Sequence, residues 1–227
     1  MRTTRGGASP VMIGRDRELR RLAQLASSGR PEVAVVAGEP GIGKTRLISE
    51  LLASLPTDVV TLVGHAVPGS LSRPYEVLMD ALDRSLHPDG DRAALDALAD
   101  PDRSPVERLH RALETVGDLI GDRPAVVVFE DLHWVDSESA ALFERIADLR
   151  GARLLVGTYR PDEVTARHPF AGLLARLERR HVVTHLPLDR FAEADTAALL
   201  AAVAGRPLPY RVVAALHQRT GGNPFFL

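Results

Sequence analysis

Apolar, β-branched runs alternate along the chain with stretches in which apolar residues recur every three or four positions. The runs are Glu32–Ala37, Asp58–His65, Arg123–Phe129, Ala152–Tyr159 and His181–Leu186. Each run is almost continuously apolar, which is typical of parallel strands covered by helices on both faces. The pattern therefore predicts five strands of one parallel sheet.

Helical periodicity fills the segments between the runs. The predicted helices lie near residues 13–25, 45–55, 74–87, 104–121, 140–149, 192–204 and 210–219. The clearest stripe is formed by Val106, Leu109, Leu113, Val116 and Ile120, at helical spacing. Strands that alternate with helices indicate an α/β fold in which the sheet is flanked by helices.

The last two helical patterns are not followed by a further strand. We therefore predict an α/β domain over residues 1–190 and the beginning of a helical lid domain over residues 191–227. Within the first domain, residues 66–121 form a helical insert, with a solvated connector at His87–Pro105. The chain ends on the apolar run Asn223–Leu227, so we expect the lid domain to continue in a longer protein.

The strongest chemical signal is the segment from Gly38 to Thr45, which reads GEPGIGKT. It matches G-x-x-x-x-G-K-[ST] and lies between the first strand and a helix, where this motif functions. Glycines let successive backbone N–H groups surround an anion, and the helix adds its positive dipole end. Lys44 can reach the β- and γ-phosphates, and Thr45 can bind Mg²⁺. The motif predicts a P-loop NTPase fold that takes ATP or ADP with Mg²⁺.

We expect the nucleotide to be held by the whole of this segment and by the residue that follows it. These residues are Gly38, Glu39, Pro40, Gly41, Ile42, Gly43, Lys44, Thr45 and Arg46. A Rossmann dinucleotide site is not supported, because no third glycine follows Gly43.

Composition sharpens the prediction for the P-loop lysine. Of the 28 lysine and arginine residues only Lys44 is a lysine, a bias that fits a high-GC bacterial genome. Arginine is a poor substitute at the phosphates, because its planar fork is bulkier and prefers bidentate partners. Phosphate chemistry therefore explains why a lysine remains at this one position.

Charge, cysteine content and hydropathy exclude several classes of protein. The net charge is −2 and cysteine is absent, which argues against direct nucleic acid binding by this chain and excludes disulfides and thiolate nucleophiles. No apolar run is long enough for a membrane span, and the first residues lack the apolar core of a secretory signal. We expect a cytoplasmic protein without a membrane partner.

A P-loop requires a carboxylate at the end of another strand, and the third strand ends on Glu130 and Asp131. One of the two can hold Mg²⁺ through its water shell while the other polarises the attacking water. Both are therefore candidates for metal binding, together with Thr45, and for catalysis, together with Lys44. The pattern does not decide which carboxylate has which role.

Residues near the ends of the third and fourth strands complete the candidate site. Trp134 is expected to pack the turn, and His133 either senses the γ-phosphate or bonds to backbone. Asp136 or Ser137 is expected to cap the next helix. The fourth strand ends near Arg160, whose charge suits a nucleotide sensor if this strand lies beside the P-loop strand.

Several segments together resemble the nucleotide-binding domain of STAND-class, AAA+-related ATPases. The segment from Val11 to Leu19 is similar to the hhGRxxEL sequence that opens this domain. The P-loop, the segment 130–136, Thr158–Arg160 and the run from Gly221 through Pro224 follow in the same order. The ATPase domain of large LuxR-type regulators, the MalT-like proteins, is the most similar group.

The resemblance implies further roles by position. Gly14 and Arg15 would line the adenine side with Ile13 as an apolar wall, Pro224 would contact the base from the lid, and Arg160 would be the sensor arginine. The family often has aspartate at the position of Glu130. The longer glutamate side chain shifts the carboxylate by about one C–C bond, which is expected to affect the rate of hydrolysis more than nucleotide binding.

Two hypotheses of function follow. The first is a nucleotide-gated switch in a bacterial transcriptional regulator, a slow Mg²⁺-dependent ATPase whose sensor and helix-turn-helix domains lie outside this chain. Under this hypothesis the protein could also self-associate when nucleotide binds. The second is an ATP-consuming enzyme, either a motor or a phosphotransferase. A further alternative is that the same ATPase module is fused to a cyclase or a kinase.

Overall fold

The computed structural model describes residues 11–68, 74–85, 102–149 and 153–227. Its centre is a five-stranded sheet in which every pairing is parallel, with strand order β2-β3-β4-β1-β5. The strands are β1 (Glu32–Ala37), β2 (Val60–His65), β3 (Ala125–Glu130), β4 (Arg153–Tyr159) and β5 (Val183–Pro187). All five predicted strands are confirmed, with ends that match or shift by at most two residues.

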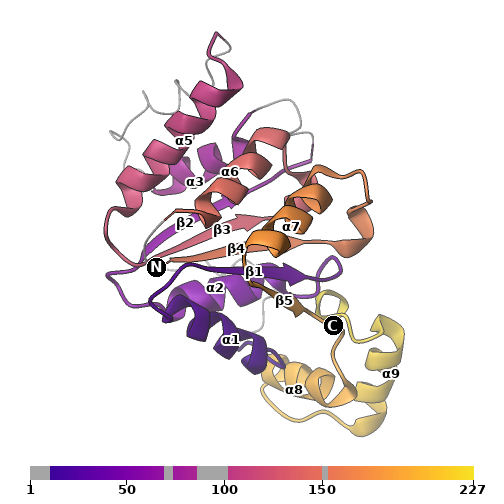
Figure 1. Cartoon of the computed structure of the whole chain (residues 1–227). Helices are drawn as coiled ribbons and strands as arrows, with labels where there is room; N and C mark the ends of the chain where they lie inside the picture. Colours follow the sequence, from indigo (N-terminus) through magenta and orange to yellow (C-terminus); the bar gives the residue numbers. More distant parts are fainter. Residues whose placement is uncertain (1–10, 69–73, 86–101, 150–152) are drawn as a thin grey trace.

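Helices cover both faces of the sheet, as the continuous apolar runs predicted (Figure 1). The helices are α1 (Asp16–Ala26), α2 (Lys44–Ser54), α3 (Glu76–Ser85), α5 (Pro105–Ile120), α6 (Ser137–Ala147), α7 (Pro169–Arg180), α8 (Glu193–Ala204) and α9 (Tyr210–Thr220). Successive strand residues point to opposite faces. Val35 and Val127 therefore pack with the layer of α3, α5, α6 and α7, whereas Val36 and Val128 pack with α1 and α2.

Local sequence explains where helices α5 and α6 begin. Ser104 and Glu107 form a reciprocal capping box that starts α5, with Pro105 at its first turn. The Asp136 side chain accepts the Ser139 N–H and caps α6, so Asp136, one of the two predicted candidates, is the capping residue. Most of the predicted connector His87–Pro105 lies outside the described residues.

Helix α7 was missing from the sequence prediction. Its apolar stripe of Phe170, Leu173 and Leu177 is fully buried, and Pro169 occupies the first turn. The stripe is short and follows a loop rich in charge and proline, so its periodicity is weak in the sequence. Within the described ranges no helix is long and apolar enough to span a membrane.

Helices α8 and α9 pack on each other beyond the β5 edge of the sheet (Figure 1). After α9 the chain turns at Gly221 and Gly222, both with positive φ, and continues into a short 3₁₀ helix, η4 (Pro224–Phe226). This turn returns the last residues to the P-loop, where the Asn223 side chain donates to the Pro40 carbonyl oxygen at 3.0 Å.

Candidate nucleotide-binding site

The P-loop leaves β1 and turns sharply into α2. Gly41 and Gly43 have φ of 73° and 104°, a left-handed backbone conformation that glycine adopts without a steric penalty. Helix α2 begins at Lys44, so its first N–H groups face the loop. The sequence therefore places glycine at both positions where the backbone must turn around an anion.

The Lys44 side chain folds back against the backbone of the P-loop. Its ammonium group donates to the carbonyl oxygens of Gly38 and Glu39, at 2.8 Å and 3.1 Å, and the residue is only 7% exposed. Burial lowers the pKa of Lys44, although the negative charge of Asp131 opposes this shift. The charge is thus held next to the anion nest by two backbone acceptors that a phosphate oxygen can replace.

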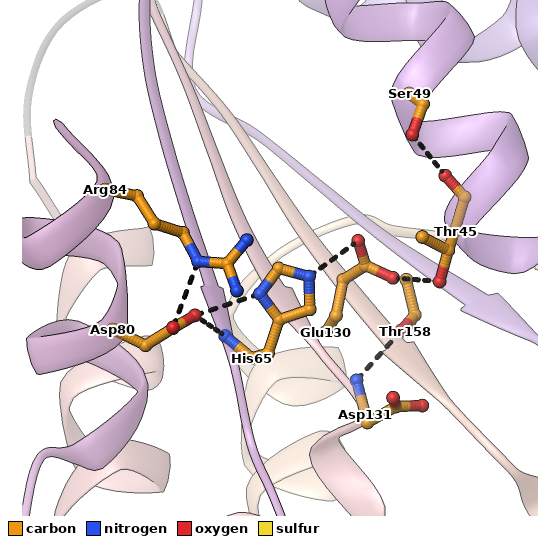
Figure 2. A network of polar contacts seen from close by, with 8 residues as sticks. All are labelled: Thr45, Ser49, His65, Asp80, Arg84, Glu130, Asp131 and Thr158. Carbon is orange, nitrogen blue, oxygen red and sulfur yellow. Dashed lines mark hydrogen bonds and ion pairs between the residues drawn. The ribbon is translucent and has the colours of Figure 1, made fainter. Parts of the chain in front are cut away.

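Thr45 and Glu130 meet across the end of the sheet. The Thr45 hydroxyl, on the first turn of α2, donates to Glu130 Oε2 at 2.6 Å, and Glu130 ends β3 and is almost fully buried (Figure 2). A hydroxyl and a carboxylate oxygen are the ligand types that Mg²⁺ takes in P-loop sites. These two residues therefore fit a Mg²⁺ ion next to the phosphates.

Asp131 lies beside this pair in a different setting. Its backbone is left-handed, with φ of 58°, and its N–H donates to the Thr158 hydroxyl oxygen at 3.0 Å (Figure 2). Thr158 is buried near the end of β4, and so it ties β4 to the turn after β3. Of the two predicted carboxylates, Glu130 is the one that contacts Thr45, whereas Asp131 acts on Lys44 through its charge.

A further group at this site escaped the sequence analysis. His65 ends β2 in register with Glu130, and its Nε2 lies 3.5 Å from Glu130 Oε1. Its Nδ1 lies 2.9 Å from Asp80 Oδ2 on α3 (Figure 2). The contact with Glu130 raises the pKa of His65, and Asp80 adds to the shift against the effect of burial. The sequence does show a polar residue, His65, at the end of a strand. Its neighbours depend on the order of the strands in the sheet, which the sequence pattern does not give.

Arg160 follows β4, which pairs with β1 as the sensor prediction required. Its Nη1 lies 2.6 Å from Glu163 Oε1, and its guanidinium lies over the Trp134 ring at 4.9 Å. His133 is buried beside them, and burial lowers its pKa while Asp131 and Glu163 oppose this shift. The sensor role of Arg160 stays a prediction; in this structure its partners are a carboxylate and an indole.

An apolar cavity of about 340 Å³ adjoins the P-loop. Its walls come from the segment before α1, from the P-loop and from the lid region. The lining includes Met12, Ile13, Arg15, Gly41, Ile42, Gly43, Arg46, Phe191, Leu199, Pro224 and Phe225. Its mixture of apolar and aromatic side chains suits a planar base. The structure brings Ile13 and Pro224 together here, although they are far apart in the sequence.

Arg15 joins the parts of this cavity. It is buried, its Nη2 donates to the Ile42 and Asp189 carbonyl oxygens at 3.3 Å and 2.5 Å, and its guanidinium stacks on Phe191. Gly14 has φ of 67°, and a Cβ built there lies 2.9 Å from Asp195 Oδ1 of α8. Arg15 thus borders the cavity, as predicted, whereas Gly14 does not line it and instead lets the opening segment approach α8 closely.

Three contacts reach the P-loop itself, two from the lid region and one from Arg190 directly before it. Asn223 binds the Pro40 carbonyl, Arg190 lies 2.7 Å from Glu39 Oε2, and Phe225 packs on Gly41. Sequence reasoning did not single out Phe191, Arg190 or Phe225, although the aromatic residues next to Pro224 were a visible signal. The site is therefore formed between the lid region and the α/β sheet.

Comparison with known proteins agrees with this geometry. The family described as "AAA ATPase domain" matches residues 11–156, and the chain belongs to this family. Curated relatives include an uncharacterised protein of Rhizobium meliloti, 28% identical over 66% of this chain, and the chaperone protein ClpB 2 of Parasynechococcus marenigrum, 32% identical over 70%. The chain spans only 19% and 16% of these relatives.

Two solved structures with TM-scores above 0.5 share the fold. A Walker-type ATPase of Pyrococcus abyssi has a TM-score of 0.61 at 16% identity, covering 94% of this chain and 65% of its own. The Hsp104–ADP complex of S. cerevisiae has a TM-score of 0.56 at 16% identity, covering 95% of this chain and 29% of its own. A STAND protein with a tetratricopeptide repeat sensor from Pyrococcus horikoshii has a TM-score of 0.48 at 17% identity, covering 95% and 29%.

Proposed function

We propose that this AAA ATPase domain binds ATP or ADP with Mg²⁺ and acts as a nucleotide-gated switch in a cytoplasmic bacterial transcriptional regulator of the LuxR type. The observation that carries the proposal is the convergence of Lys44, Thr45 and Glu130, with lid residues bonded to the same loop. Nucleotide would then change how tightly the lid is held, and domains outside this chain would respond to that change.

Each part of the nucleotide has residues that suit it. The base would lie in the apolar cavity against Ile13 and Pro224, and the phosphates in the loop from Gly38 to Thr45. Lys44 would exchange its two backbone acceptors for phosphate oxygens. Mg²⁺, when bound by Thr45 and Glu130, would neutralise charge on the β- and γ-phosphates. Asp131 would orient water, and Arg160 would sense the γ-phosphate.

Lys44→Ala tests nucleotide binding directly. We expect loss of measurable ADP and ATP affinity in calorimetric titrations, because a Coulombic and hydrogen-bonding partner of the phosphates is removed. The fold should remain, as measured by circular dichroism. Arg30→Ala is the matched control, since Arg30 is an exposed cation near the opposite end of β1, paired with Glu32. Wild-type ADP affinity in the Lys44 variant would contradict the proposed site.

Lys44→Arg tests why this position retains a lysine. We expect it to bind nucleotide at least tenfold more weakly than wild type although its charge is unchanged, because the wider guanidinium does not fit the place that the Gly38 and Glu39 carbonyls define. Affinity equal to wild type would show that charge alone is required.

A second candidate function is an ATP-consuming motor with rapid turnover, and the relative named chaperone protein ClpB 2, 32% identical over 70% of this chain, is the reason to test it. Steady-state hydrolysis separates the two. A switch is expected to turn over well below roughly one ATP per second, whereas a rate well above this favours the motor.

A further inference from the structure

Glu130 has a partner on each carboxylate oxygen, and the two partners come from opposite directions. Oε2 accepts the Thr45 hydroxyl of the P-loop helix at 2.6 Å. Oε1 faces His65 Nε2 at 3.5 Å, from the end of the neighbouring strand β2. The carboxylate is almost fully buried, so these contacts rather than water set its orientation (Figure 2).

The histidine is itself held by the helical insert. Asp80 Oδ2 lies 2.9 Å from His65 Nδ1 and also accepts the His65 backbone N–H at 2.8 Å. The other oxygen of Asp80 accepts Arg84 Nε at 3.0 Å (Figure 2). Carboxylates only accept hydrogen bonds, and His65 thus presents a ring nitrogen to each of two acceptors. The imidazole ring therefore has one favoured orientation, fixed by α3.

We propose that His65, supported by Asp80, is a positioning residue that orients Glu130 for Mg²⁺ and thereby links the helical insert to the metal end of the site. The inference rests on the proposed nucleotide function. It gives β2 and α3, which lie outside the phosphate-binding motifs, a role in orienting the metal ligand.

The physical reason lies in the length of the glutamate side chain. Glutamate has one more rotatable bond than aspartate, so a carboxylate held on one oxygen alone keeps torsional freedom that metal binding must remove. The imidazole nitrogen that faces the second oxygen at 3.5 Å, held in place by Asp80, restricts that freedom before the metal arrives. Outer contacts of this kind commonly change metal affinity or activity by about 10- to 100-fold.

Metal affinity of the ADP-loaded chain provides the test. The probe is Mn²⁺, whose free concentration is measured by electron paramagnetic resonance. We expect His65→Ala to weaken Mn²⁺ binding about tenfold, with metal-free ADP affinity unchanged. His65→Gln, which keeps an N–H donor, should recover most of the loss. His110→Ala is the control, since this exposed histidine pairs only with Glu114 in the described structure.

The role of Asp80 is tested through a double variant. Asp80→Asn should weaken Mn²⁺ binding less than His65→Ala, and the double variant should equal His65→Ala alone, because Asp80 acts through the ring. Wild-type Mn²⁺ affinity in His65→Ala, no recovery in His65→Gln, or additive losses in the double variant would each overturn the inference. Absence of ADP binding by the wild-type chain would instead overturn the proposed function, and the inference with it.

Discussion

Single residues at this site are explained by their contacts as much as by their motif. Gly41 has φ of 73°, and a Cβ built on it lies 2.4 Å from the Cβ of Phe225. The glycine therefore serves the turn of the P-loop and the approach of the lid segment at once. The sequence motif accounts for the first task, whereas the second is visible only when residues 41 and 225 are placed together.

Gly41→Ala tests this double role against Gly29→Ala. Gly29 has the same φ of 73°, but nothing lies within 4 Å of its Cβ position, so its variant reports backbone strain alone. We expect a loss of stability of about 1 kcal/mol for Gly29→Ala and a larger loss for Gly41→Ala. ADP affinity should fall only in Gly41→Ala. Equal unfolding free energies and ADP affinities for the two variants would show that the Phe225 contact is unimportant.

The elements were largely predictable from the sequence, whereas their lateral order was not. The inner strands β1, β3 and β4 stood out as continuous apolar runs because a strand buried on both faces cannot contain polar residues at alternate positions. The neighbours of β3 depend on crossovers that the pattern does not encode. The contact between His65 and Glu130 was therefore hidden, whereas the motif placed Thr45 near one of two carboxylates and the structure shows that it is Glu130.

Helix α3 packs against β2 at Gly64. A Cβ built on Gly64 lies 1.9 Å from the Val77 carbonyl oxygen, so α3 packs directly on the strand backbone. We expect Gly64→Ala to displace α3 and to cost about 1–3 kcal/mol in urea unfolding, since overpacking against backbone cannot be relieved by a rotamer change.

Gly157→Ala is the comparison for this prediction. A Cβ at Gly157 meets the Leu132 side chain, 2.5 Å from its Cδ1, and this methyl group can move. We expect a smaller loss of unfolding free energy than for Gly64→Ala. The reverse order would indicate that α3 adjusts to the strand more easily than the Leu132 side chain does.

At the scale of the whole molecule, the last residues of the chain close the site from the lid side. The Asn223 amide binds the Pro40 carbonyl, and Asn223 is the only asparagine in the sequence. The prediction of a lid over residues 191–227 rested on two helical patterns and a resemblance. Asn223 and Phe225 of that segment contact the P-loop, and so does Arg190, which directly precedes it.

Asn223→Ala should loosen the lid. Losing one hydrogen bond of about 1 kcal/mol predicts roughly fivefold faster amide exchange in α8 and α9, measured by hydrogen–deuterium exchange mass spectrometry. ADP should slow this exchange in the wild-type chain more than in the variant. Gln218→Ala, an exposed amide residue on α9, is the control and should exchange as the wild type does. Unchanged exchange in the Asn223 variant would mean that the lid is held by its other contacts.

The solitary lysine makes the centre of the site chemically addressable. Apart from the amine at the start of the chain, Lys44 carries the only primary amine in this sequence. Reductive methylation with ¹³C-labelled formaldehyde should therefore add a single side-chain signal to a carbon spectrum. Because the modified nitrogen is the atom expected to meet the phosphates, bound ADP should protect it from the reagent, so the intensity of this one signal reports occupancy of the site.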